Sequence, residues 1–168
     1  MSVEHLSKRR DFLLFEEQMR QAGSPSGEVL IAHLFSETLL DRIITKRLPG
    51  GAKFLEKGKP NYAQKLFLAE ALNNLSDDVA QSLTQLNKVR NQLAHNFGRN
   101  VTNEDIEHIG SPLAMFGQLK AQIKPVDTRA LLGVALAAVC AALSAFASAA
   151  EDGLPLGSVK IANPRFKT

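Results

Sequence analysis

The stretch "ALLGVALAAVCAALSAFASAA", residues 130–150, contains no charged residue and consists of alanine in about half of its positions. Its large side chains recur at helical spacing along one stripe, while alanine, glycine and serine fill the remaining positions. That stripe consists of Leu132, Leu136, Val139, Leu143 and Phe146. Because small faces let neighbouring backbones approach closely, this pattern is typical of a helix buried on all sides. The stretch therefore predicts the central helix of an all-α bundle.

The same stretch has roughly the length needed to span a bilayer. However, alanine supplies little transfer free energy, and basic or aromatic residues do not flank both ends. The N-terminal residues "MSVEHLSKRRDFLLFEEQMR" are charged throughout, without the apolar core of a signal peptide. Cys140, the single cysteine, lies among alanine and valine and is expected to be a buried core thiol. These features predict a cytoplasmic protein with no membrane span.

Helical periodicity appears in nearly every other segment, and no strand pattern with a period of two stands out. We expect an up-and-down bundle of about five to six helices. Residues 1–150 would form one domain and residues 151–168 a C-terminal arm or tail. The expected helices cover residues 3–21, 27–48 behind Ser26, 61–75, 77–96 behind Ser76, a short helix opened by a Thr102–Asp105 capping box and interrupted at Ser111-Pro112, and the alanine-rich helix behind Asp127 and Thr128, with a basic loop at 50–60.

The composition, 45% hydrophobic and 22% charged, is that of a globular protein. The formal net charge is only +3, which permits a nucleic-acid partner without arguing for one. Electrostatic binding would require that positive charge be gathered on one face. Function must therefore be sought in local motifs.

One such motif is "LNKVRNQLAHN", residues 86–96, late in an expected helix. Its apolar stripe continues from Val79 to Phe97, whereas Asn87, Asn91 and His95 form a polar ridge at positions i, i+4 and i+8. Arg90 and His95 are five residues apart, so an ideal helix separates them by about 140° and about 7.5 Å. They would converge if the helix ended or bent near "HNFG", or across a two-fold dimer in which two copies of the segment face each other.

Residues 90–95, Arg-Asn-Gln-Leu-Ala-His, resemble the Arg-x4-6-His motif of the HEPN superfamily (higher eukaryotes and prokaryotes nucleotide-binding). The resemblance implies an all-α bundle, usually dimeric, and for many members a metal-independent ribonuclease of toxin–antitoxin or RNA-processing systems. It implies Arg90 and His95 as the catalytic pair, with Asn91 as the polar residue after the arginine. The order of helices over residues 28–150 agrees with this family, and a less active branch is similar to the mannitol-operon repressors.

These residue types suit RNA cleavage without a metal or other cofactor. Imidazole, with an ordinary pKa near about 6.5, can take the proton of the RNA 2′-hydroxyl or protonate the leaving oxygen. A guanidinium holds the scissile phosphate through paired donors and stabilises the charge that develops in the transition state. Because the RNA's own 2′-hydroxyl is the nucleophile, DNA should not be cleaved. The partners implied are RNA, a second copy of the chain, and a cognate antitoxin or regulatory protein.

Several supporting residues have alternative interpretations. Glu37, or less favourably Asp41, is expected to orient Arg90, although a solvated acid on the outer face of its helix fits the pattern equally. Asn87 extends the polar ridge of the motif. His33 and Glu37 could ligate a metal, but the sequence offers no further ligands at suitable spacing. Three loop lysines either contact an RNA backbone or are simply solvated: Lys53, Lys57 and Lys59.

Two functions from different classes follow. The first is a HEPN-like endoribonuclease or toxin-like module that acts on RNA as a homodimer. The second is a non-catalytic helical regulator, similar to the mannitol-operon repressors, that works through protein–protein contacts. Both require the same fold, so only the surroundings and chemistry of Arg90 and His95 distinguish them.

Overall fold

The computed structural model describes residues 3–123, 127–155 and 159, with side chains from Asp11 onward. Every regular element within these ranges is an α-helix, which confirms the predicted all-α class. The described ranges contain eight helices, slightly more than expected. They are α1 (Val3–Gln21), α2 (Pro25–Arg47), α3 (Gly51–Gly58), α4 (Tyr62–Ala71), α5 (Asp77–His95), α6 (Asn103–Gly110), α7 (Ala114–Lys120) and α8 (Thr128–Glu151).

The alanine-rich helix α8 packs against α2, α5, α6 and α7. Its Leu132, Leu136 and Leu143 are almost completely buried, and burial of each such side chain contributes about 1.5–3 kcal/mol. By length and composition alone, α8 could also cross a membrane. Here, however, its large side chains are covered by the other helices. Cys140 on α8 is buried as expected, and burial raises the pKa of its thiol.

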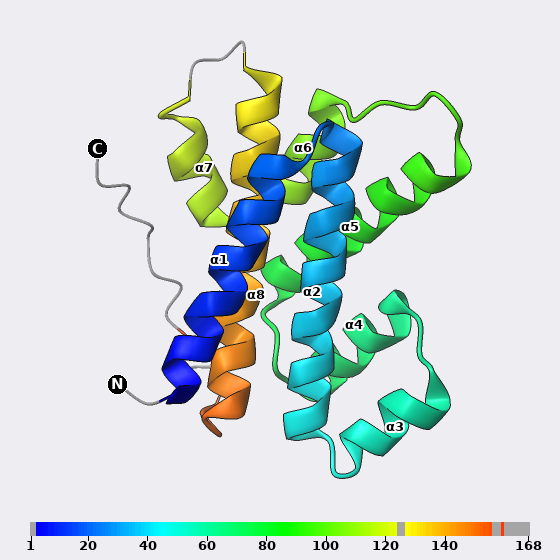
Figure 1. The fold of residues 1–168 in the computed structure, drawn as a ribbon, viewed down its shortest axis with the longest axis vertical. Coiled ribbons are helices and arrows are strands. Elements are labelled where there is room, and N and C mark those ends of the chain that lie inside the picture. Colours follow the sequence, from blue (N-terminus) through cyan, green and yellow to red (C-terminus); the bar gives the residue numbers. More distant parts are fainter. Residues whose placement is uncertain (1–2, 124–126, 156–158, 160–168) are drawn as a thin grey trace.

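Helix α2 lies between two parts of the molecule. Figure 1 shows α1 running antiparallel to α2, whereas α8 follows the same direction as α2. Helices α4 and α5 pack on α2 from another side, and α3 connects α2 to α4 at one end of the bundle. Side chains on different faces of α2 therefore belong to different environments, one shared with α1 and α8 and the other with α4 and α5.

The start of α2 and the segment after it differ from the predictions. Ser24, not Ser26, is the N-cap of α2, and its side chain accepts a hydrogen bond from the Gly27 N–H at 3.1 Å. The intervening Pro25 has a fixed φ that suits the first helical position. Residues 51–58 were predicted to be part of a loop, and this is wrong because they form α3. The corner before α3 needs a glycine, since a Cβ on Gly51 would lie 2.2 Å from the carbonyl oxygen of Ile44.

Several other helix ends agree with the sequence. The Thr102–Asp105 capping box at the start of α6 is confirmed, as are Ser76 and Asp127 as the N-cap positions of α5 and α8. The prediction that Phe97 belongs to the apolar stripe of α5 is wrong. Helix α5 ends at His95, and Phe97 beyond it is fully exposed to solvent.

The predicted arm, residues 151–168, falls mostly outside the described residues. Glu151 is the last residue of α8, and Val159 packs against the core. The guanidinium of Arg47 donates hydrogen bonds to the carbonyl oxygens of Ala149 and Leu154, which ties the end of α8 to α2.

Candidate phosphate-binding site

A polar cavity of about 430 Å³ lies where α2, α4 and α5 meet. Helix α5 contributes three of its side chains, α2 contributes two, and the first turn of α4 with its N-cap completes the wall. The lining residues are His33, Glu37, Asn61, Tyr62, Ala63, Asn87, Arg90 and Asn91. Four residues predicted for the site thus line one cavity: Glu37, Asn87, Arg90 and Asn91.

The rotation of α5 about its axis places the motif in this cavity. Val79, Leu83 and Leu86 are completely buried in the core and fix one face of the helix. Asn87 and Asn91 are four residues apart and therefore point in nearly the same direction, along one edge of that face. They are held together by a long hydrogen bond of 3.5 Å from Asn91 Nδ2 to Asn87 Oδ1.

Arg90 is half-buried and is bound by an amide rather than by an acid. Its Nη1 donates a hydrogen bond to Asn91 Oδ1 at 3.1 Å. Among the described residues, no carboxylate forms an ion pair with this guanidinium. A permanent cation at the wall of a cavity therefore keeps most of its donors available to a ligand.

The prediction that Glu37 or Asp41 orients Arg90 is wrong. Lys65 on α4 is almost completely buried and takes both carboxylates instead, with Nζ 2.9 Å from Glu37 Oε1 and 3.0 Å from Asp41 Oδ2. Burial tends to lower the pKa of Lys65, but the hydrogen bonds of Asp41 and Glu37 outweigh it and raise the pKa overall. Glu37 in the cavity wall is thus paired with Lys65, which it shares with Asp41, and not with Arg90.

His33 is a member of the site that the sequence analysis considered only as a metal ligand. Its ring is buried and stacks on Tyr62 with the ring centroids 4.1 Å apart. Burial is the main cause that lowers the pKa of His33, and the positive charge of Arg90 lowers it further. A neutral imidazole results, with Nε2 3.1 Å from Asn87 Oδ1 and Nδ1 buried without a partner among the described atoms.

The contact between His33 and Tyr62 explains why the sequence did not predict that His33 lines this cavity. The two residues are far apart in the chain and meet only because α4 packs on α2. The one local signal was the spacing of His33 and Glu37, which puts both on the same face of α2. Ser36 joins this cluster, since its hydroxyl donates to the carbonyl oxygen of His33 at 2.8 Å and lies 2.9 Å from the Tyr62 hydroxyl.

His95 does not share this cavity. It is the last residue of α5, exposed to solvent, and α5 remains helical as far as this position. The predicted bend near "HNFG" therefore comes after His95 and does not turn its ring toward Arg90. Within one chain, the structure separates the two residues that the motif was expected to bring together.

The remaining predicted positions lie outside the cavity. Lys53 and Lys57 are exposed on α3, and Lys59 is the exposed C-cap of that helix with a positive φ of 43°. None of the three belongs to the cavity wall. Within the described ranges, no group of three or more metal-ligating side chains occurs, and His33 with Glu37 gains no third ligand.

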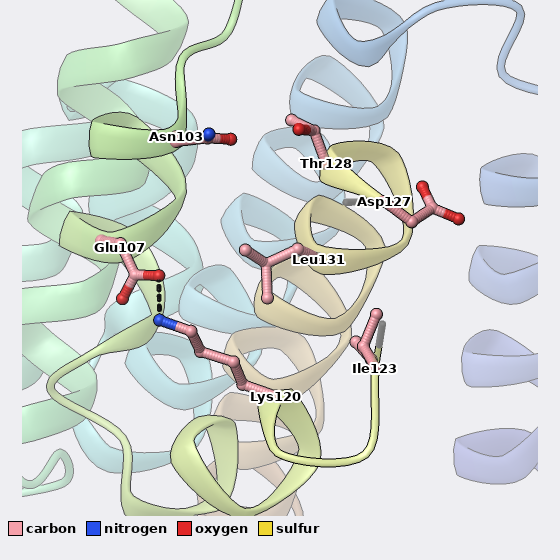
Figure 2. Close-up of a pocket in the computed structure, with 7 residues that line it drawn as sticks. All are labelled: Asn103, Glu107, Lys120, Ile123, Asp127, Thr128 and Leu131. Atoms are coloured by element: carbon pink, nitrogen blue, oxygen red, sulfur yellow. Dashed lines mark hydrogen bonds and ion pairs between the residues drawn. The ribbon is translucent and has the colours of Figure 1, made fainter. Parts of the chain in front are cut away.

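A second cavity, of about 250 Å³, lies between α6, α7 and the start of α8. Figure 2 shows Lys120 and Glu107 pointing toward each other in its wall, where they form an ion pair. Asp127 points away from this pair, and its Oδ1 accepts the Ala130 N–H at 2.9 Å as the helix cap of α8. Since the cation of this cavity is already neutralised, it is a poorer anion site than the cavity at Arg90.

No family model, curated protein or solved structure matches this chain. The chemistry of the site therefore rests on its own groups. These are the guanidinium of Arg90, the amides of Asn87 and Asn91, and the neutral ring of His33. The guanidinium and the two amides supply hydrogen-bond donors and one positive charge, which is the complement of an oxyanion such as phosphate. His33 adds no donor, because its Nε2–H faces Asn87 Oδ1 and its Nδ1 is then an acceptor.

Proposed function

We propose that this protein is a HEPN-like, metal-independent endoribonuclease that acts on cytoplasmic RNA as a homodimer. The observation that carries the proposal is the guanidinium of Arg90, which lines a polar cavity and has no carboxylate partner in the described chain. A charge-assisted, two-pronged contact with a phosphodiester would satisfy it. Toxin-like activity and control by an antitoxin belong to the same proposal.

In the proposed reaction, Arg90 binds the non-bridging oxygens of the scissile phosphate and stabilises the charge added in the transition state. The 2′-hydroxyl of the RNA attacks the phosphorus, and the bond to the 5′-oxygen breaks. His95 exchanges protons with these oxygens as general acid or base. The products are one strand with a 2′,3′-cyclic phosphate and one with a free 5′-hydroxyl.

A dimer is required because His95 lies outside the Arg90 cavity of its own chain. An exposed apolar ridge on α2 supports such an association. Leu30 and Leu34, 44% and 53% exposed, lie four residues apart and continue to Glu37 at the edge of the cavity. Two copies joined through this ridge would bring two cavities close to a two-fold axis, where the partner's His95 could approach a phosphate held by Arg90.

The test is incubation of purified protein with mixed RNA in EDTA. We expect fragments that end in cyclic phosphate, and we expect them to be lost in both Arg90→Ala and His95→Ala. A chemically matched substrate with 2′-deoxyribose should remain intact, because it lacks the nucleophile. Cleavage that persists in both variants, or that requires a divalent metal, would contradict the proposed mechanism.

The separation of Arg90 and His95 in one chain favours a second candidate, a non-catalytic regulator that acts through protein contacts. The same ridge of Leu30 and Leu34 would then bind a protein partner or a second copy. Light scattering separates the two candidates when combined with the RNA assay. An intact dimer without cleavage by the wild-type protein would favour the regulator.

A further inference from the structure

The wall of the cavity at Arg90 includes a second positively polarised group, the backbone at the start of helix α4. The wall includes Tyr62 and Ala63, the first two helical residues of α4, next to the N-cap Asn61. Helix N-termini carry free N–H groups and a partial positive charge, which together favour bound anions. This wall lies in the same cavity as the guanidinium of Arg90.

The hydrogen bonds of this helix start leave two donors unused. A capping box satisfies two of the first N–H groups: Asn61 N donates to Gln64 Oε1 at 2.9 Å, and Gln64 N donates to Asn61 Oδ1 at 3.0 Å. The N–H groups of Tyr62 and Ala63 have no partner within the described chain, as expected for the first turn of a helix. The first turn of α4 also contains no acidic residue that could neutralise it.

Independent side chains point to a ligand in the same place. Within the described chain the half-buried guanidinium of Arg90 donates only to Asn91, which leaves its other donors available to a ligand in the cavity. The ring of His33 adds no contact to an anion, because its Nε2–H donates to Asn87 Oδ1 and its Nδ1 is then an acceptor. Asn87 Oδ1 faces His33 Nε2 and accepts from Asn91 Nδ2, which leaves the Asn87 Nδ2 donor without a partner in the described residues. These unused donors line the same cavity as the start of α4 and are suited to an acceptor such as a phosphate oxygen.

The charges around the cavity are arranged so that its one carboxylate has a partner and its guanidinium has no acidic one in the described chain. Glu37, the carboxylate of the wall, is bound by Lys65, which it shares with Asp41 outside the wall. His33 is neutral because burial and the nearby Arg90 lower its pKa. The groups that face the cavity without an acidic partner in the described chain are the guanidinium of Arg90 at one side and the start of α4 at another.

We propose that the first turn of α4 and the Arg90 guanidinium together clamp one phosphate group of an RNA strand. The backbone N–H groups of Tyr62 and Ala63 donate to one phosphate oxygen and Arg90 to the others. This inference rests on the proposed function for its choice of RNA, but it concerns binding alone and requires neither His95 nor cleavage. Ala63 and Asn61 become specificity-determining positions that the motif does not include.

This clamp is tested by a substitution that stabilises helix α4 but repels an anion from its first turn. Ala63→Glu places a carboxylate at the second helical position of α4, where it favours the helix dipole but repels a phosphate. The matched control is Ala52→Glu, which puts the same charge at the second helical position of α3, outside the cavity. The probe is a fluorescent 2′-O-methyl oligoribonucleotide, which cannot be cleaved because its 2′-oxygen is blocked.

We expect Ala63→Glu to weaken binding of this probe by about tenfold or more, and Ala52→Glu to stay within about twofold of wild type. Asn61→Asp, which keeps an equally good N-cap, should weaken binding in the same direction. Thermal unfolding should show both α4 variants as stable as wild type or more stable. Inorganic phosphate should compete with the probe for wild type but not for Ala63→Glu.

Binding by Ala63→Glu equal to that of wild type would overturn the clamp, as would equal losses in Ala63→Glu and Ala52→Glu or no binding by wild type. Probes with and without a 5′-terminal phosphate show whether the group held is terminal or internal to the strand. The result is independent of the cleavage assay. A chain that cleaves RNA but binds normally as Ala63→Glu would refute only the clamp, whereas a chain that loses binding but never cleaves would refute only the ribonuclease.

Discussion

Arg42 on α2 and Arg90 on α5 are both partly buried, yet their surroundings are opposite. Arg42 binds Glu151 through two hydrogen bonds, Nε to Oε1 at 2.7 Å and Nη2 to Oε2 at 2.9 Å, and reaches Asp11 at 3.3 Å. Among the described residues, Arg90 binds only the amide of Asn91. The first arginine joins α1, α2 and α8, while the second faces a cavity.

The difference distinguishes an arginine whose charge is paired within the fold from one whose guanidinium can still bind a ligand. A guanidinium cannot release its proton, so a partly buried one must find acceptors in the protein or in a ligand. The carboxylates around Arg42 satisfy that need within the fold, and their hydrogen bonds raise the pKa of Arg42. Arg90 retains donors that the fold does not use. A motif search cannot make this distinction, because both residues are arginines on predicted helices.

The largest expected effect tests this contrast directly. Arg42→Ala should lower the free energy of unfolding by about 2–3 kcal/mol, because Glu151, only 10% exposed, loses its two-pronged cation. Arg90→Ala should lower it by less than about 1 kcal/mol, because only one amide contact is lost. Urea denaturation of the two variants gives both values. Equal losses would mean that Arg90 is a structural residue like Arg42.

A smaller effect concerns pH and the neutral ring of His33. Its pKa is lowered in the folded protein, first by burial, so the unfolded chain binds a proton that the folded chain excludes. Stability attributable to His33 is therefore complete above the ordinary histidine pKa of about 6.5. It decreases as the pH falls from there toward the lowered folded value, with a slope of at most about 1.4 kcal/mol per pH unit.

Denaturation midpoints measured between pH 7.5 and 5.5 check this slope. His33→Asn removes the titrating group and should flatten the profile, even if the loss of stacking on Tyr62 lowers stability at every pH. Arg42→Ala serves as the comparison and should keep the slope of the wild type, since its contacts do not include His33. A wild-type profile that is flat over this range would contradict a neutral, buried His33.

The smallest expected effect concerns Glu37, which lines the same cavity as Arg90 but is paired with Lys65. Glu37→Gln should change the free energy of unfolding by less than about 1 kcal/mol, because Asp41 still binds Lys65 and an amide oxygen can accept from the same Nζ. Binding of the 2′-O-methyl probe should be unchanged or slightly tighter, because a negative charge leaves the cavity. Loss of probe binding in Glu37→Gln would contradict this expectation.

Much of the helical fold was predictable because local rules agree with the tertiary structure. The start of α4 behind Asn61, the capping box of α6 and the burial of α8 follow from cap chemistry and apolar periodicity. The helix α3 was missed because its formation depends on a corner at Gly50 and Gly51 that brings the backbone against Ile44. The N-cap of α2 was misplaced by two residues because two serines flank Pro25.

The sequence by itself determined the all-α class, the buried alanine-rich helix and the placement of Asn87 and Asn91 on one polar ridge of α5, since helical periodicity decides which residues share a face. Only the tertiary structure decided what those residues meet. It gave both carboxylates of α2 to Lys65, set His33 and the start of α4 beside Arg90, and left His95 outside. Contacts between helices depend on how whole faces pack, and no short stretch of sequence contains that information.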